Sequence, residues 1–252
     1  MAHFSRTLSL LMFSVILSAC ASDSVTHAPT TDAKTLRLEL STAMSTNRIL
    51  AYSETWEALS KIHEVSPGKI RLFYTRRIVD ASNRASGEDQ SELEYWNREH
   101  LWPQSYGVRM NPAKTDLHNL VPADQTVNSS RGNKFFDTGI EAHHECAQCW
   151  TSTEAWEPPD EVKGDIARMM FYVDVRYEAL FDDGVGDLAL SDSPEPGNKI
   201  FGKLSTLLRW HCSDPVSENE VRRHETTALI QGNRNAFVDS PELVSVIYNY
   251  GC

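Results

Sequence analysis

Two neighbouring segments, residues 95–105 and 115–133, limit the possible fold more than any other feature of this chain. The first, YWNREHLWPQS, has the pattern of a strand that ends near Pro103, and the second opens with an extended piece, TDLHNLVPA. Its continuation, PADQTVNSSRGN, predicts a helix with Pro122 in its first turn and Gly132 at its end. Any fold of this chain therefore has to contain a strand, a second strand and a helix in that order.

Polar side chains stand at defined positions in this unit. Glu99 and His100 are adjacent in a mostly apolar and aromatic strand, so they point to opposite faces unless a local bend turns both toward one cleft. Taken alone, the pair reads as a partly exposed Glu and a His at the edge of the core. Asn128 and Arg131 are three residues apart on the predicted helix, so they share a face. Together the two segments bring a His and an Asn into one small unit.

The rest of the chain predicts a mixed α+β domain. Helical periodicity occurs in residues 36–47, 53–65, 159–181, 198–214 and 217–233, and residues 69–80 alternate as a strand. No loop between these segments is long enough to force a domain boundary. We therefore expect a single α+β domain.

The N-terminus has the pattern of an export signal. Arg6 precedes the apolar run TLSLLMFSVILSA, which is too short to span a membrane as a mature anchor. The LSAC sequence that ends at Cys20 resembles the bacterial lipoprotein box, in which the signal is cut before a Cys that carries lipid. An ordinary signal cleaved near Ala19 or Ala21 is the alternative.

These features divide the chain into three expected parts. They are a signal peptide at 1–19, a lipidated Cys20 with a flexible tether through residue 35, and a domain at 36–252. No Asp directly follows Cys20, which suits sorting to the outer membrane of a Gram-negative host. We expect an exported protein, periplasmic or extracellular, that meets the membrane only through this lipid anchor.

Export also decides how the five cysteines are interpreted. If Cys20 carries lipid, four cysteines remain, and an even number in an oxidising compartment favours two disulfides. One pairing closes the short loop between Cys146 and Cys149, and the other pairings tie this loop to Cys212 or Cys252. The motif HHECAQCW also has the spacing of a zinc site, but outside the cytosol we favour a disulfide.

Charge excludes one class of function. The net charge is −11 and the chain has no polybasic run, which argues against a tight, purely electrostatic nucleic-acid binder. An enzyme that grips a few phosphates with local arginines and a metal ion is still compatible with this charge.

Several motifs resemble those of one known family. The segment NREHLWPQS followed by TDLHNLVPADQTVNSSRGN resembles the bacterial endonuclease I family of secreted and periplasmic nucleases. WEPPDEVKGDIARMMFYVDVRYE and QGNRNAFVDSPE resemble its extracellular members, so the likeness runs from Trp96 to Glu242. The resemblance implies a ββα-metal core, also called a His-Me finger, surrounded by helices. It also implies metal-dependent cleavage of DNA, and often RNA, that leaves 5′-phosphate ends.

The resemblance implies roles for three residues. His100 matches the general base, and Glu99 and Asn128 match the two protein ligands of a single divalent metal ion. A neutral imidazole with an ordinary pKa of about 6.5 can take a proton from water near neutral pH. One carboxylate and one amide oxygen are hard ligands that suit Mg²⁺, with Mn²⁺ or Ca²⁺ as alternatives by ligand type.

Supporting roles follow from the same likeness. An arginine is expected to stabilise charge on the phosphate, and Arg109 and Arg131 are the candidates, with a surface charge or a fold-stabilising salt bridge as the alternative for each. Asp116, His118 and Asn119 are expected to hold the other nitrogen of the catalytic imidazole. The alternative, which we favour for His118, is a buried polar group satisfied by the backbone.

The sequence therefore predicts an exported, metal-dependent and largely sequence-nonspecific endonuclease that acts on DNA, with RNA as a second substrate, as a monomer. Its contacts are expected mostly at backbone phosphates. One alternative is a non-catalytic lipoprotein that uses the fold to bind nucleic acid or to act as a scaffold, and the other is a phosphodiesterase of small nucleotides. The joint presence of Glu99, His100 and Asn128 argues against the first alternative.

Overall fold

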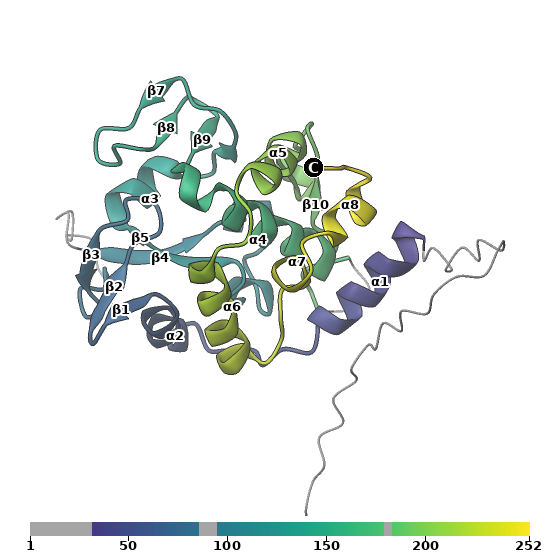
Figure 1. Ribbon diagram of the computed structural model, residues 1–252. Helices are drawn as coiled ribbons and strands as arrows, with labels where there is room; N and C mark the ends of the chain where they lie inside the picture. The colour runs from purple at the N-terminus through teal and green to yellow at the C-terminus, as the bar shows by residue number, and fades with distance from the viewer. Residues whose placement is uncertain (1–31, 86–94, 179–182) are drawn as a thin grey trace, which may run out of the picture. The chain divides into compact units, whose positions relative to one another are not determined.

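The predicted strand–strand–helix unit is present. Strand β4 (Trp96–His100) pairs antiparallel with β5 (Leu120–Asp124), and helix α3 (Gln125–Arg131) follows β5 directly (Figure 1). Pro122 lies within β5 and not in the first turn of α3, and its carbonyl accepts a hydrogen bond from the N–H of Phe73. Gly132 follows the helix at a positive φ of 56°, as an end at this glycine requires. The ββα arrangement is therefore confirmed, with the helix starting three residues after the proline.

The computed structural model describes residues 32–85, 95–178 and 183–252, and residues 32–252 form one compact α+β unit. The predicted signal peptide, Cys20 and most of the tether lie outside the described residues. Helix α1 (Ala33–Met44) begins earlier than expected, because the side chain of Asp32 accepts a hydrogen bond from the N–H of Thr35 and caps it. In the described part of the chain, no helix is both long enough and apolar enough to cross a membrane.

Helix α4 (Lys163–Arg176) is central to the core. All of its residues except Lys163 and Met169 are buried, because α1, α5 (Leu204–Ser213) and α7 (Ala236–Asp239) pack on it from different sides (Figure 1). The remaining helices are α2 (Glu54–Ile62), α6 (Glu218–Gln231) and α8 (Leu243–Tyr248). Within the described residues, short 3₁₀ turns occur at Gln104–Tyr106, Ala113–Thr115, Asp160–Val162 and Pro196–Asn198.

The single strand predicted over residues 69–80 is instead two strands. Strands β1 (Glu64–Ser66), β2 (Lys69–Arg71) and β3 (Ile78–Asp80) form an antiparallel sheet in that order. The chain reverses between β2 and β3, where Arg76 has a positive φ of 60°. Leu72, Phe73 and Tyr74 keep the apolar pattern through the reversal because they are buried in the core.

A second sheet carries one of two disulfides. Its strand order is β6 (Phe135–Phe136), β9 (Ala155–Glu157), β8 (Trp150–Thr151) and β7 (Glu141–Ala142), and a separate parallel pair joins β10 (Ala189–Leu190) to β11 (Ile200–Phe201). Cys146 and Cys149 are bonded in the loop between β7 and β8, and Cys212 at the end of α5 is bonded to Cys252. The prediction of two disulfides is confirmed, and HHECAQCW therefore offers no thiolate to zinc.

Candidate active site

One face of β4 is turned toward α3. Asn97 and Glu99 occupy alternate positions of the strand, so their side chains share this face. The amide of Asn128 donates a hydrogen bond to Oδ1 of Asn97 at 2.6 Å, and Nη1 of Arg131 lies 3.1 Å from Oε1 of Glu99. The strand and the helix therefore bring Glu99 and Asn128 to the same interface.

The other face of β4 is turned toward Tyr52. The guanidinium carbon of Arg98 lies 3.5 Å from the centre of the Tyr52 ring, and the imidazole of His100 stacks on that ring at 6.2 Å between centres. Glu99 and His100 thus leave the strand on opposite faces, with no bend that joins them. Any reaction that uses both residues takes place at the end of β4, where the two faces meet.

The Glu99 carboxylate is fixed in a buried position. It is 3% exposed, and the hydroxyl of Tyr74 donates a hydrogen bond to Oε1 at 2.8 Å. Burial raises the pKa of Glu99, while the charge of Arg131 and the hydrogen bond from Tyr74 oppose this rise. The local partners therefore favour the ionised form of an otherwise desolvated acid.

The imidazole of His100 is held in one tautomer. Its Nε2 lies 2.9 Å from the backbone carbonyl oxygen of Lys114. A carbonyl only accepts, so Nε2 carries the proton and Nδ1 keeps a free lone pair in the neutral ring. The amide of Gln104 is 3.4 Å from this Nδ1. Burial lowers the pKa of His100 to about 4, so the ring is neutral at pH 7 and able to accept a proton.

Arg131 connects α3 to the end of β4 from inside the core. Its side chain is fully buried, and it donates from Nη1 to the carbonyl of His100 at 3.0 Å and from Nη2 to the carbonyl of Leu101 at 2.6 Å. The guanidinium also lies 4.6 Å from the centre of the Phe136 ring. Together with the Glu99 ion pair, these contacts occupy both terminal nitrogens of the guanidinium. Arg131 therefore has a structural role, in which it holds the site together.

Arg109, the second arginine candidate, is exposed. Its Nε donates to the backbone carbonyl of Gln104 at 3.3 Å, and the side chain of Gln104 faces the His100 ring. Of the two candidates, Arg109 is the one whose guanidinium solvent and substrate can reach.

Asp116 is a hub of the core and does not contact His100. It is fully buried, and the hydroxyls of Tyr172 and Tyr177 each donate to its Oδ2 at 2.9 Å. The amide of Gln231 donates to Oδ1 at 2.8 Å. This carboxylate joins β5, α4 and α6, which is a structural role.

His118 and Asn119 also have partners other than His100. Nε2 of His118 lies 3.3 Å from the carbonyl of Asn233, and burial lowers the pKa of His118 to about 4. Oδ1 of Asn119 accepts from the N–H of Trp102 at 2.7 Å. These side chains were expected to support the imidazole of His100, but the backbone carbonyl of Lys114 does so instead. A backbone carbonyl cannot be identified as such a partner from a sequence.

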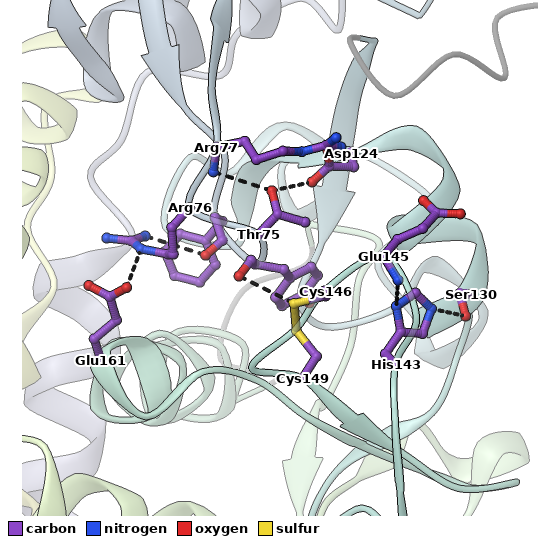
Figure 2. Close-up of a disulfide and its surroundings, with 12 residues drawn as sticks. Thr75, Arg76, Arg77, Asp124, Ser130, His143, Glu145, Cys146, Cys149 and Glu161 are labelled. Atoms are coloured by element: carbon purple, nitrogen blue, oxygen red, sulfur yellow. Dashed lines mark hydrogen bonds and ion pairs between the residues drawn. A yellow bond between two sulfur atoms is a disulfide. The ribbon is translucent and has the colours of Figure 1, made fainter.

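The disulfide loop, residues 143–149, supports α3 from outside (Figure 2). Nε2 of His143 hydrogen-bonds Oγ of Ser130 at 2.8 Å, and Sγ of Cys146 lies 3.5 Å from the carbonyl oxygen of Tyr74. Since the hydroxyl of Tyr74 binds the buried carboxylate of β4, the disulfide, the strand and the helix form one connected structure.

The side chains between β4 and α3 fit a divalent metal in their chemistry. Glu99, Asn97 and Asn128 offer one carboxylate and two amide oxygens, which are hard ligands of the kind Mg²⁺ prefers. Among the described residues, no group of three or more His, Cys, Asp and Glu side chains could hold a metal ion, so a carboxylate-rich site is not available. Asn97 escaped the sequence reasoning, although its position two residues before Glu99 on one strand would have found it.

The part of the chain that forms this site is similar in sequence to known nucleases. The Endonuclease I family model matches residues 32–242, which contain β4, β5 and α3. The extracellular ribonuclease of Bacillus amyloliquefaciens is 40% identical over 220 residues, which cover 84% of this chain and 73% of that protein. The extracellular deoxyribonuclease of Aeromonas hydrophila is 28% identical over 181 residues, which cover 66% of this chain and 71% of that protein.

A more distant relative, the Endonuclease-1 of Buchnera aphidicola subsp. Acyrthosiphon pisum, is 26% identical over 129 residues, or 50% of this chain and 44% of its own length. The family match covers nearly all of the compact unit described above, including the strand with Glu99 and His100 and the helix with Asn128. On this match, the chain belongs to the endonuclease I family.

Proposed function

We propose that this enzyme is an exported, metal-dependent endonuclease that hydrolyses phosphodiester bonds of DNA and of RNA with little sequence preference. The relatives support export and both substrates, because one is named an extracellular ribonuclease and another an extracellular deoxyribonuclease. The observation that carries the proposal is the interface of β4 and α3, where Asn128 contacts Asn97 and Arg131 contacts Glu99, next to a neutral His100 whose ring is held by a carbonyl.

Mg²⁺ is the ion we propose for this site, with Glu99 and Asn128 as its protein ligands, Asn97 beside them, and Mn²⁺ or Ca²⁺ as possible substitutes by ligand type. When bound, such an ion neutralises negative charge at the scissile phosphate and at the leaving oxygen. The ion pair with Arg131 and the hydroxyl of Tyr74 hold the Glu99 carboxylate in place and favour its ionised form.

The chain's own residues supply the proton chemistry. Nδ1 of His100 takes a proton from the attacking water, and the carbonyl of Lys114 at Nε2 fixes the ring and stabilises the imidazolium that results. Arg109 is the exposed cation available to the phosphate oxygens. The water oxygen forms a bond to phosphorus and the bond to the 3′ oxygen breaks; the 3′ oxygen takes a proton from solvent and Nδ1 of His100 returns its proton to solvent, which leaves a 5′-phosphate and a 3′-hydroxyl end.

The relatives support export, and the N-terminal sequence is the basis for the proposed lipid anchor. We place the mature enzyme in the periplasm or outside the cell, as a monomer attached to the outer membrane through lipid on Cys20. Mass spectrometry of the mature N-terminus tests this placement, since a diacylglyceryl group on Cys20 supports it and cleavage after Ala21 contradicts it.

A plasmid-nicking assay tests the activity. We expect supercoiled plasmid to be nicked in Mg²⁺, protected by EDTA, and cut about 10²–10⁴-fold more slowly by His100→Ala. Cleavage that is insensitive to EDTA, or a wild-type rate in His100→Ala, would contradict the proposal. RNA and a chromogenic phosphodiester are assayed in parallel, and a preference for the small ester would favour a phosphodiesterase of small nucleotides.

A further inference from the structure

Most arginines of the described structure are neutralised by carboxylates, as expected in a chain of net charge −11. Arg98 and Lys114 are exceptions, as are Arg71, Arg109, Arg209 and Arg222. Within the described residues, neither Arg98 nor Lys114 has a carboxylate at ion-pair distance, and both lie on the His100 side of β4. Two such cations that contact one tyrosine ring beside the catalytic imidazole, in an acidic protein, indicate a place where an anion binds.

Arg98 is fixed without being neutralised. Its guanidinium carbon lies 3.5 Å from the centre of the Tyr52 ring and 4.1 Å from that of the Trp56 ring. Nη1 donates to the carbonyl of Tyr52 at 2.5 Å and to Oγ1 of Thr55 at 3.3 Å. These contacts restrict the side chain and leave its charge, its Nε and its Nη2 to a ligand, which is a preorganised arrangement for phosphate.

Lys114 completes the cluster from the opposite segment. Its ammonium lies 4.6 Å from the centre of the same Tyr52 ring, while its backbone carbonyl receives the hydrogen bond from His100. Both cations are close enough to His100 that, after burial, their charges help to lower its pKa. Tyr52, Arg98 and Lys114 therefore border the catalytic imidazole directly.

We propose that Tyr52, Arg98 and Lys114 form a subsite that binds a backbone phosphate of the cleaved strand, beside the scissile one. This inference rests on the proposed nuclease function. Because Arg98 leaves β4 on the face opposite Glu99, its phosphate is a neighbour of the one attacked. A phosphodiester offers the charge and the paired oxygens that a guanidinium and an ammonium bind together.

Salt dependence of binding measures such contacts directly. Binding of a fluorescent single-stranded oligonucleotide is followed by anisotropy between 50 and 200 mM salt, in EDTA to prevent cleavage. Each cation that is removed from contact with the backbone phosphates reduces the slope of log K against log salt by about 0.7 for a single strand. We expect the slope to fall by about 1.4 in Arg98→Gln/Lys114→Gln, which corresponds to about a sevenfold smaller loss of affinity over this salt range.

The matched control is Lys34→Gln/Arg209→Gln. It removes the same charge from two positions on α1 and α5, and we expect it to keep the wild-type slope. Lys114→Gln alone keeps the backbone carbonyl that holds His100. A fall in the salt slope of about 0.7 can therefore be measured in this variant even if replacing Arg98 prevents folding. Hydrolysis of bis(p-nitrophenyl) phosphate, which has no neighbouring phosphate, is expected to be slowed less than plasmid cleavage in Lys114→Gln, and to stay at the wild-type rate in the control variant Lys34→Gln/Arg209→Gln.

The outcomes separate the two proposals. If the wild type cleaves plasmid but Lys114→Gln and the double variant have the slope of the control, the subsite is wrong and the nuclease function stands. If the wild type neither binds the oligonucleotide nor cleaves plasmid, both proposals fail. A fall in slope that is confined to the Arg98 and Lys114 variants, with the small ester less affected than plasmid in Lys114→Gln, supports the subsite.

Discussion

Replacing Arg131 with methionine tests whether this guanidinium acts on substrate or holds the site together. In the structure the side chain is fully buried between the Glu99 carboxylate, 3.1 Å away, and the carbonyls of His100 and Leu101. Methionine keeps much of the aliphatic volume over Phe136 and removes only the charge and the donors. The variant therefore isolates the polar contacts of one residue.

The expected loss of stability follows from those contacts. Removing one partner of a buried ion pair leaves an uncompensated charge and costs about 3–5 kcal/mol. The two carbonyls also lose their donors, and the retained volume keeps any cavity small. We expect the free energy of unfolding to fall by about 4 kcal/mol, a large share of the roughly 5–15 kcal/mol typical of a domain. Loss of the opposing charge also raises the pKa of Glu99 further.

Urea denaturation followed by circular dichroism measures this loss, with Arg109→Met as the exposed control that stays within about 0.5 kcal/mol of the wild type. In a double-mutant cycle, Glu99→Gln/Arg131→Met removes both charges, so its loss is expected to be smaller than the sum of the single losses by about 2 kcal/mol. The reasoning is refuted if Arg131→Met unfolds like the wild type while cleavage falls about 10³-fold, because that combination identifies a group acting on the transition state.

Three further predictions concern the framework. Cys252→Ser opens the bridge to Cys212, whose sequence separation is 40, and is expected to lower stability by about 4 kcal/mol in calorimetry; an unchanged melting temperature would contradict this. Tyr177→Phe removes one hydrogen bond to the Asp116 carboxylate and is expected to cost about 2 kcal/mol in urea denaturation. Burial lowers the pKa of His118 from its ordinary 6.5 to about 4, so the unfolded chain binds the extra proton between these values. The contribution of neutral His118 to the free energy of unfolding is complete above pH 6.5 and decreases toward pH 4; at pH 5 it is smaller by about 2 kcal/mol. A His118→Gln variant that loses stability in acid as steeply as the wild type would refute this.

The ββα unit could be predicted from the sequence because each of its parts has a local signal. The strand Trp96–His100 is apolar and aromatic, and Gly132 marks the end of the helix by an ordinary rule of helix termination. The start of that helix was predicted too early because of Pro122. A proline fits the first turn of a helix, and it also fits a strand position where no hydrogen bond from the backbone nitrogen is needed. The error was local and left the order of elements intact.

The partners of the site residues could not be predicted, because they come from contacts that are distant in sequence or from the backbone. Tyr74 donates to Glu99 across 25 positions, and the carbonyl that holds His100 belongs to Lys114, whose side chain is irrelevant to that bond. Arg131 was correctly placed on the face of Asn128 by helical spacing, but spacing does not show whether that face is open or buried. Burial was decided by how α3 packs against β4.

The segment TDLHN shows why polar residues close to a catalytic strand need not take part in the reaction. Asp116 accepts hydrogen bonds from Tyr172 in α4, from Tyr177 just after it and from Gln231 of α6, and Asn119 holds the chain just after His100 through both backbone groups of Trp102. An uncompensated buried carboxylate would be costly, so these three donors and the N–H of His118 make this acid tolerable in the core. The end of β4 is thereby held to the helices without any side chain being aimed at the reaction. Chemistry in this fold depends on the few groups at that end that the core does not engage, namely the Nδ1 of His100, which only the amide of Gln104 approaches at 3.4 Å within the described residues, and the cations around it.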